Sequence, residues 1–160
     1  MSIRPLQHGD VISLRGILEA TKVFRAEEID VAQELMEHAL DQPGQEDYEL
    51  FTDVDEQGRV LGYYCVGATP MTEGTYDLYW IATDPSLHGQ GVGSRLLRHC
   101  EERLRSKGGR LIVVETSSQP SYEPTRSFYV RRGYREEARI RAYYKTGDDL
   151  VIYTKNLMED

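Results

Sequence analysis

The sequence predicts a fold of the α/β class (α+β in some schemes), in which helices flank a mostly antiparallel central sheet of about six or seven strands. Three observations lead to this prediction. Two apolar segments joined by a turn at 48–67 indicate an antiparallel hairpin. A strand, a glycine-rich loop, a helix and another strand follow at 77–116, and such a crossover places two central strands parallel. Two more strand patterns occupy 134–156.

The composition is that of a soluble globular protein. The chain has 160 residues, of which 39% are hydrophobic and 29% charged, and this suits a single domain spanning 1–160. The net charge of −8 argues against nucleic acid as a partner, because its phosphates would be repelled. No apolar run reaches the length of a membrane span, and residues 2–5 do not lead into a signal-peptide core. We therefore expect a cytoplasmic protein without a membrane partner.

The cysteines and histidines do not form a recognisable site. Cys65 and Cys100 fall in a strand pattern and a helix pattern, which predicts buried thiols in a reducing compartment. The four histidines lack a metal-ligand spacing, so we expect solvated side chains and no metal site; they are His8, His38, His88 and His99.

The first 67 residues are expected to form one strand, two helices and the hairpin. We predict, in order, a strand near Ile3–Leu6, a helix after Gly9–Asp10, a helix at about Ala26–Leu40, and strands at Tyr48–Val54 and Val60–Gly67. The second helix is ended by Asp41-Gln42-Pro43-Gly44, and the turn Asp55–Gly58 joins the two strands.

The stretch from Asp77 to Ser106 carries the clearest functional pattern. The apolar strand Leu78–Ala82 leads through Gly89-Gln90-Gly91-Val92-Gly93 into an amphipathic helix. The first amides of a helix lack internal partners, and glycines let the chain approach an anion, so this loop is typical of phosphate binding. A tight turn that needs glycine for its geometry alone is the alternative. The lysine of a Walker loop and the third glycine of a dinucleotide fingerprint are absent.

The remaining residues predict a buried strand, a helix and a second hairpin. Arg110–Thr116 is a continuous β-branched run, typical of a strand buried on both faces. A loop at 117–124 precedes a helix at Thr125–Arg132, with Pro124 suited to its first turn. Two final strands, at about Tyr134–Tyr144 and Leu150–Asn156, are joined by a turn at 146–149.

These segments resemble the GNAT superfamily of acyl-CoA-dependent N-acetyltransferases. The family signature is Arg or Gln, two residues, Gly, one residue, and Gly or Ala; residues 88–93 match it except that His88 stands first. Residues 128–134 resemble the family's segment of Leu or Phe, Tyr, three residues, Gly and an aromatic residue, whereas Tyr122 replaces its usual Asn. The resemblance implies acetyl transfer from acetyl-CoA to a primary amine of a small molecule or peptide. The alternative is a non-catalytic CoA-sensing or partner-binding module on the same fold.

The resemblance also implies roles for particular residues. The donor would be held by Ile81, Ala82, Thr83, His88, Gly89, Gln90, Gly91, Val92, Gly93 and Ser94. Tyr129 matches the family's general acid, which would protonate the departing thiolate, and packing in the core is the alternative role. Asp77 and Glu115 stand where members carry the base, and burial of Glu115 in its apolar run would raise its pKa usefully. Outward-facing charges, with a water chain as the base, are the alternative.

The acceptor pocket is expected on the other side of the central strands from the CoA arm. The resemblance points to Phe24, Arg25, Tyr122, Tyr143 and Tyr144 as its lining, although tyrosine is also frequent on half-buried surfaces. Many members of the family form dimers, so a homodimer is left open, and no segment of the sequence identifies an interface.

Overall fold

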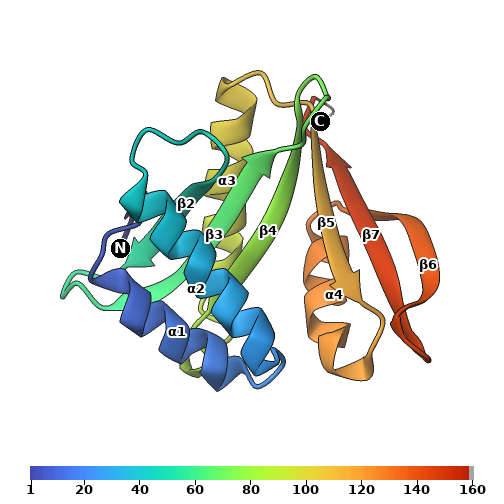
Figure 1. Cartoon of the computed structure of the whole chain (residues 1–160), viewed down its shortest axis with the longest axis horizontal. Helices are drawn as coiled ribbons and strands as arrows, with labels where there is room; N and C mark the ends of the chain where they lie inside the picture. Colours follow the sequence, from blue (N-terminus) through green and yellow to red (C-terminus); the bar gives the residue numbers. More distant parts are fainter. Residues whose placement is uncertain (159–160) are drawn as a thin grey trace.

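The computed structural model describes residues 1–158, and within this range it contains a seven-stranded sheet in the order β1-β2-β3-β4-β5-β7-β6 (Figure 1). Neighbouring strands are antiparallel, except that β4 and β5 run parallel. The predicted fold class, with its central parallel pair, is confirmed.

Most element boundaries lie within a residue or two of the predicted ones. The strands are β1 (Ser2–Pro5), β2 (Glu49–Val54), β3 (Val60–Ala68), β4 (Thr75–Thr83), β5 (Leu111–Ser117), β6 (Arg135–Lys145) and β7 (Asp148–Asn156). The helices are α1 (Asp10–Thr21), α2 (Ala26–Asp41), α3 (Val92–Ser106) and α4 (Glu123–Arg131), with 3₁₀ turns η1 (Pro85–Leu87) and η2 (Pro120–Tyr122). The last hairpin is tighter than predicted, because Asp148 already pairs with Lys145 and leaves a two-residue turn.

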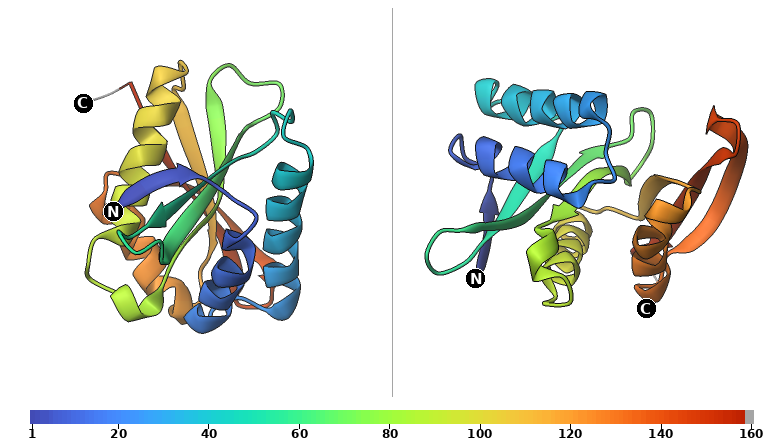
Figure 2. Two further views of the ribbon diagram at one scale, coloured as in Figure 1. Left: turned by 90° about the vertical axis from the view of Figure 1, so that its left-hand side faces the viewer. Right: turned by 90° about the horizontal axis from the view of Figure 1, so that it is seen from below.

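Helices cover both faces of the sheet (Figure 2). On the face covered by α1 and α2, called here the α1/α2 face, Leu14 and Met36 pack with Tyr63 of β3. On the opposite α3/α4 face, Leu97 and Tyr129 share one core; its other members include Leu78, Leu96, Cys100, Leu104, Ile112 and Val114. The chain thus builds two cores that are separated by the sheet.

The strands β4 and β5 form the parallel pair only at one end. Residues Thr75–Asp77 pair with Leu111–Val113, and beyond these three pairs the two strands diverge, as Figure 1 shows. Tyr79 has no partner on β3, because the register shifts by one residue between Leu78 and Trp80. Such a bulge bends its strand, so the edge of β4 beyond Asp77 is free of β5 and faces an opening in the sheet.

The burial of β5 differs from the prediction. Ile112 and Val114 are buried on the α3/α4 face, whereas Val113 is half-buried and Glu115 is exposed. The prediction of a strand buried on both faces is wrong, because none of the described helices covers the other face of β5 where β4 has moved away. A β-branched run also results when one face is packed and the other borders a cleft.

The cysteines are buried as predicted, but one histidine is not solvated. Burial raises the pKa of the Cys65 thiol to about 12 and also raises that of Cys100. His99 is half-buried, with Nδ1 2.8 Å from the Tyr64 hydroxyl and its ring 4.9 Å from that of Phe51, and burial lowers its pKa. Within the described residues, no helix combines the length and apolar character needed to cross a bilayer.

Candidate active site

A cleft of about 640 Å³ lies where β4 and β5 separate. Its walls come from four parts of the chain: the α1–α2 loop with the start of α2, the two diverging strands, the segment from η2 to α4, and the β6–β7 hairpin. The three predicted catalytic candidates, Asp77, Glu115 and Tyr129, all line this cleft.

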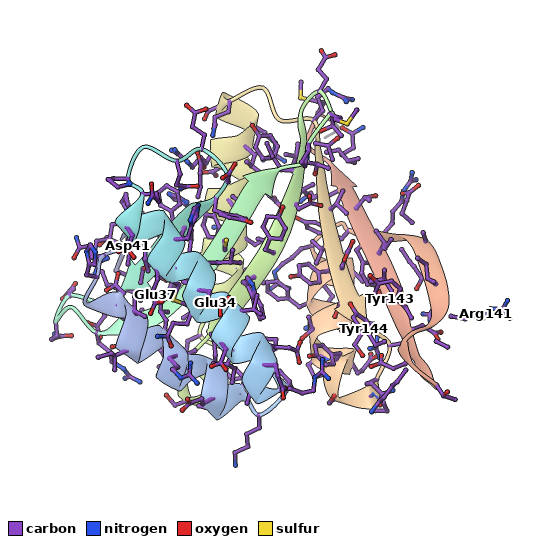
Figure 3. All side chains as sticks on the ribbon, in the orientation of Figure 1. Glu34, Glu37, Asp41, Arg141, Tyr143 and Tyr144 are labelled. Atoms are coloured by element: carbon purple, nitrogen blue, oxygen red, sulfur yellow. The ribbon has the colours of Figure 1, made fainter. Side chains whose placement is uncertain are left out.

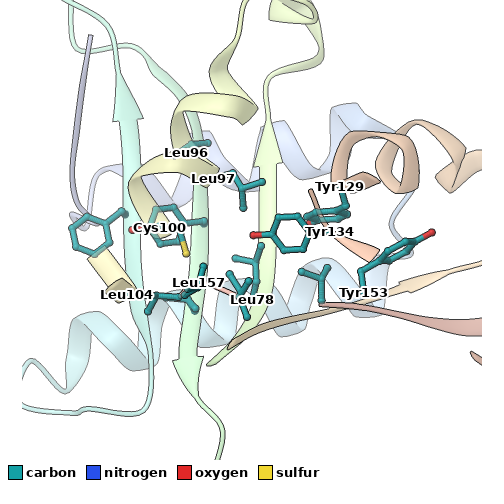
Figure 4. Close-up of a cluster of buried hydrophobic side chains, with 14 of the residues drawn as sticks. Leu78, Leu96, Leu97, Cys100, Leu104, Tyr129, Tyr134, Tyr153 and Leu157 are labelled. Carbon is teal, nitrogen blue, oxygen red and sulfur yellow. The ribbon is translucent and has the colours of Figure 1, made fainter. Parts of the chain in front are cut away.

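Tyr129 reaches the cleft from the α3/α4 face. Its side chain is only 3% exposed, and its ring centroid lies 5.4 Å from that of Tyr134 and 6.3 Å from that of Tyr153 (Figure 4). Its hydroxyl has no hydrogen-bond partner within residues 1–158, although the residue borders the cleft. Burial raises the pKa of Tyr129, so the phenol keeps its proton at neutral pH. Tyr129 therefore belongs to the hydrophobic core and also lines the cleft.

Asp77 and Glu115 lie on the opposite face of the sheet. Their neighbours Leu78 and Val114 belong to the α3/α4 core, and adjacent strand residues point to opposite faces. The Asp77 carboxylate accepts a hydrogen bond of 2.7 Å from the Thr69 hydroxyl. The Glu115 carboxylate has no hydrogen bond or ion pair among the described residues. Glu115 is exposed, so the burial expected from its apolar neighbours is absent.

The glycine loop places a left-handed residue at the start of α3. Gly91 has a φ of +81°, and its carbonyl oxygen accepts the first helical hydrogen bond from the amide of Arg95 at 3.0 Å. No side chain caps this helix. The amides of Val92, Gly93 and Ser94 therefore lack partners in the helix and face outward from its start. At Gly93, an added Cβ would lie 3.0 Å from the Phe128 ring, so glycine is needed for close approach to α4.

Two arginines fix the start of α3. Arg95 donates hydrogen bonds of 2.8 and 3.2 Å to Oδ2 of Asp53, a fully buried residue on β2. Arg132, which follows α4, donates to the hydroxyl of Ser94, and its Cζ lies 3.8 Å from the centre of the Phe128 ring. Sequence reasoning missed both contacts, because each joins residues about 40 positions apart.

The other residues predicted to hold the donor are divided by the sheet. Ile81 lines the cleft, whereas the side chain of Ala82 is buried in the α1/α2 core. Thr83 is half-buried at the end of β4, and residues 88–91 are exposed in the loop beyond it. Ala82 does not line the cleft.

Four of the five residues expected to line an acceptor pocket border the cleft. Phe24, Arg25, Tyr122 and Tyr144 border the cleft, but Tyr143 does not. Tyr143 instead packs edge-to-face on Tyr144, with the two ring centroids 5.0 Å apart. Sequence reasoning missed Glu28, Trp80 and Asp148, which line the cleft from α2, β4 and β7.

A sequence model of the acetyltransferase (GNAT) family matches residues 17–134. The chain belongs to the GNAT acetyltransferase family. A GNAT-family protein from Desulfovibrio desulfuricans has a crystal structure that is 40% identical, covers 98% of each chain and superposes with a TM-score of 0.90. An uncharacterized N-acetyltransferase of Methanocaldococcus jannaschii is 27% identical over 142 residues, which are 82% of this GNAT chain and 88% of that protein.

A third comparison concerns the fold alone. An aminoglycoside 6′-N-acetyltransferase crystallised with coenzyme A shares 19% identity with this GNAT chain and has a TM-score of 0.77. The likeness covers 100% of this chain and 99% of that one.

Proposed function

We propose that this GNAT protein transfers the acetyl group of acetyl-CoA to a primary amine of a small molecule or peptide by direct attack. The amine nitrogen forms a bond to the thioester carbonyl carbon, and the carbon–sulfur bond breaks. Tyr129 gives its proton to the departing thiolate, and a carboxylate or water accepts the proton that the amine loses. The observation that carries the proposal is that the buried residue Tyr129, whose hydroxyl has no partner among the described residues, lines the same cleft as Asp77 and Glu115.

The two faces of the sheet suit two substrates. Tyr129 comes from the face that carries the glycine loop, and the carboxylates lie on the other face. A thioester that enters from the α3 side would bring its sulfur to the phenol. An amine that enters from the α1/α2 side would meet Asp77 and Glu115. Acid and base would then act from opposite sides of the reacting carbonyl.

The residues at the start of α3 fit the diphosphate of a CoA molecule. The unpartnered amides of residues 92–94 and the partial positive charge of the helix start favour an anion. The left-handed Gly91 lets the loop turn without a side chain that would cover these amides. The unpaired edge of β4 beyond Asp77 offers further backbone donors and acceptors.

Glu115 is the better of the two candidate bases. Its carboxylate has no protein partner among the described residues, so all of its acceptor capacity is available to an amine. Asp77 already accepts the Thr69 hydroxyl, so part of its acceptor capacity is occupied within the protein. A water molecule between the amine and Glu115 would serve the same purpose.

Calorimetric titration tests the donor assignment. We expect micromolar binding of acetyl-CoA and no binding of ATP or NAD under the same conditions. Release of the CoA thiol is then measured with a panel of primary amines. Acetyl-CoA binding without turnover on any amine would favour the CoA-sensing module, and absence of acetyl-CoA binding would refute the proposal.

A further inference from the structure

Carboxylates outnumber cations in the wall of the cleft. Four acidic residues line it, which are Glu28, Asp77, Glu115 and Asp148, against the two cationic residues Arg25 and Lys145. Arg25 is mostly exposed, with a side chain that is 77% accessible, and its Nε lies 3.4 Å from Oε1 of Glu28. Lys145 is also exposed. The lining residues thus carry a net negative formal charge, which favours a cation in the cleft.

Asp148 is a buried carboxylate with unused acceptor capacity. The residue is 8% exposed and borders the cleft at the start of β7. Its Oδ1 accepts the Ser117 hydroxyl at 2.5 Å, whereas its Oδ2 has no hydrogen-bond partner in the part of the chain that the structure describes. This oxygen is not among the fully buried unpartnered atoms, so it remains available to a donor on a ligand bound in the cleft.

Aromatic side chains complete the same part of the cleft. Phe24 and Trp80 meet edge-to-face with their ring centroids 5.3 Å apart, and Tyr122 and Tyr144 lie on the other wall. Burial, followed by the negative charge of Glu28, raises the pKa of Tyr122 to about 12. Burial and the charges of Glu115, Asp148 and Glu28 raise the pKa of Tyr144. Three carboxylates from three elements therefore act on one aromatic-walled space.

We propose that the acceptor is an amine that carries a second positive charge, and that Glu28, Asp148 and the aromatic wall hold this distal cation. The inference rests on the proposed transfer to an amine and specifies the acceptor's chemical class. Ammonium groups are attracted both to carboxylates and to the faces of aromatic rings. The reacting amine would lie between Tyr129 and Glu115, where β4 and β5 diverge. An acceptor with a distal carboxylate would be repelled.

A matched acceptor series tests the distal charge. For chains of four, six and eight carbons, the α,ω-diamine, the 1-alkylamine and the ω-amino acid present the same reacting amine with a distal cation, methyl or carboxylate. We expect kcat/KM of the diamine to exceed that of the alkylamine by about tenfold at one chain length or more, after correction for its two ends. At each chain length, we expect the ω-amino acid to have the lowest kcat/KM of the three acceptors. The product should be the mono-acetylated diamine, because an amide no longer supplies the distal charge.

Two variants locate the effect. Glu28→Gln is expected to reduce the diamine-to-alkylamine ratio of kcat/KM severalfold, and Asp148→Asn to do the same if it folds. Glu34→Gln is the matched control, because it removes the same charge from α2 at an exposed position outside the cleft, which Figure 3 marks. This control should keep both the ratio and the activity of the wild type. Thermal unfolding of each variant separates a folding defect from a change in selectivity.

Ionic strength provides a test without a substitution. Raising NaCl from 0.05 to 0.5 M should lower the diamine-to-alkylamine ratio, because salt screens the attraction. Equal kcat/KM for diamine and alkylamine at every chain length, or a preference for the ω-amino acid, would overturn the inference and leave the transferase proposal intact. If Glu28→Gln and Glu34→Gln change the diamine-to-alkylamine ratio of kcat/KM equally, the assignment of the subsite to Glu28 is overturned. Absence of turnover on all nine acceptors, with acetyl-CoA bound, would instead count against the transferase itself.

Discussion

The hydroxyl of Tyr122 donates a hydrogen bond of 3.2 Å to the main-chain carbonyl oxygen of Val23, and this contact joins η2 to the α1–α2 loop. Both residues line the cleft. Tyr122→Phe removes the bond and keeps the ring. A hydrogen bond of this kind contributes about 1 kcal/mol, and here it holds two parts of the cleft wall together. If all of this energy supports amine binding, KM for the amine should rise about fivefold. The acetyl-CoA affinity should not change, because the glycine loop lies on the other face.

Steady-state kinetics at saturating acetyl-CoA and calorimetry measure the two quantities. Tyr143→Phe is the control, because it removes a hydroxyl from an exposed tyrosine outside the cleft. Weaker acetyl-CoA binding in Tyr122→Phe with an unchanged amine KM would contradict the expected separation of the two sides.

Tyr129→Phe tests the proposed acid. Loss of the phenol proton should lower kcat by about a hundredfold or more while acetyl-CoA still binds, because protonation of the leaving thiolate is removed. Tyr153→Phe removes a hydroxyl from the adjacent stacked ring (Figure 4). Tyr153 does not line the cleft. Its kcat should stay close to that of the wild type. Similar kcat values for Tyr129→Phe and the wild type would exclude Tyr129 as the acid.

The ion pair of Arg95 with Asp53 should be important for stability. Arg95→Met leaves the fully buried Asp53 carboxylate without its cation, which should cost about 3–5 kcal/mol in the free energy of unfolding. The control is Arg103→Met on the same helix, because Glu49 keeps Lys107 as a partner and this pair is exposed. We expect the control to cost about 0–1 kcal/mol. Urea unfolding gives both values. If Arg95→Met cost as little as the control, the Asp53 carboxylate would not need its partner.

The buried phenols and thiols predict a loss of stability in alkali. Burial raises the pKa values of Tyr63, Tyr64 and Tyr129 and of the thiols Cys65 and Cys100. The unfolded chain releases these protons at about pH 8.5 for the thiols and about pH 10 for the phenols, whereas the folded chain retains them. The stabilisation is therefore complete below these values and is lost as the pH rises above them, by up to about 1.4 kcal/mol per pH unit and group.

Urea unfolding at pH 7.5, 9, 10 and 11 measures this dependence. Tyr64→Phe should make the alkaline decline shallower, whereas Tyr143→Phe, at an exposed position, should keep the wild-type slope. A free energy of unfolding that is constant up to pH 11 would be incompatible with burial of these groups.

Local pattern was sufficient for most of the fold. Apolar spacing predicted α2 and α3, and the turn around Gly58 predicted the β2–β3 hairpin. Local pattern failed at β5, because the face of the strand that carries Val113 and Glu115 borders the cleft. Nothing in the neighbouring residues records that β4 diverges beyond Val113. His99 was misplaced for a similar reason, since its partner Tyr64 lies 35 positions away.

Residues of the candidate site could be predicted only where they lie in a recognisable sequence motif. Tyr129 and the glycine loop follow from family-like segments, and the structure brings Tyr129 to the same cleft as Asp77 and Glu115. Glu28 and Asp148 belong to no motif. They reach the cleft because α2 and the last hairpin converge on it, and this convergence is a property of the assembled fold.

The separation of the two faces also affects how such a protein can change. The residues on the proposed donor side belong to a central block of the chain and to α4, whereas much of the proposed acceptor wall comes from the α1–α2 loop and the β6–β7 hairpin. Substitutions in these two short segments could redirect the enzyme to another amine while the helix start that faces the donor stays intact. An ancestral sequence could thus diversify its acceptors without losing its donor.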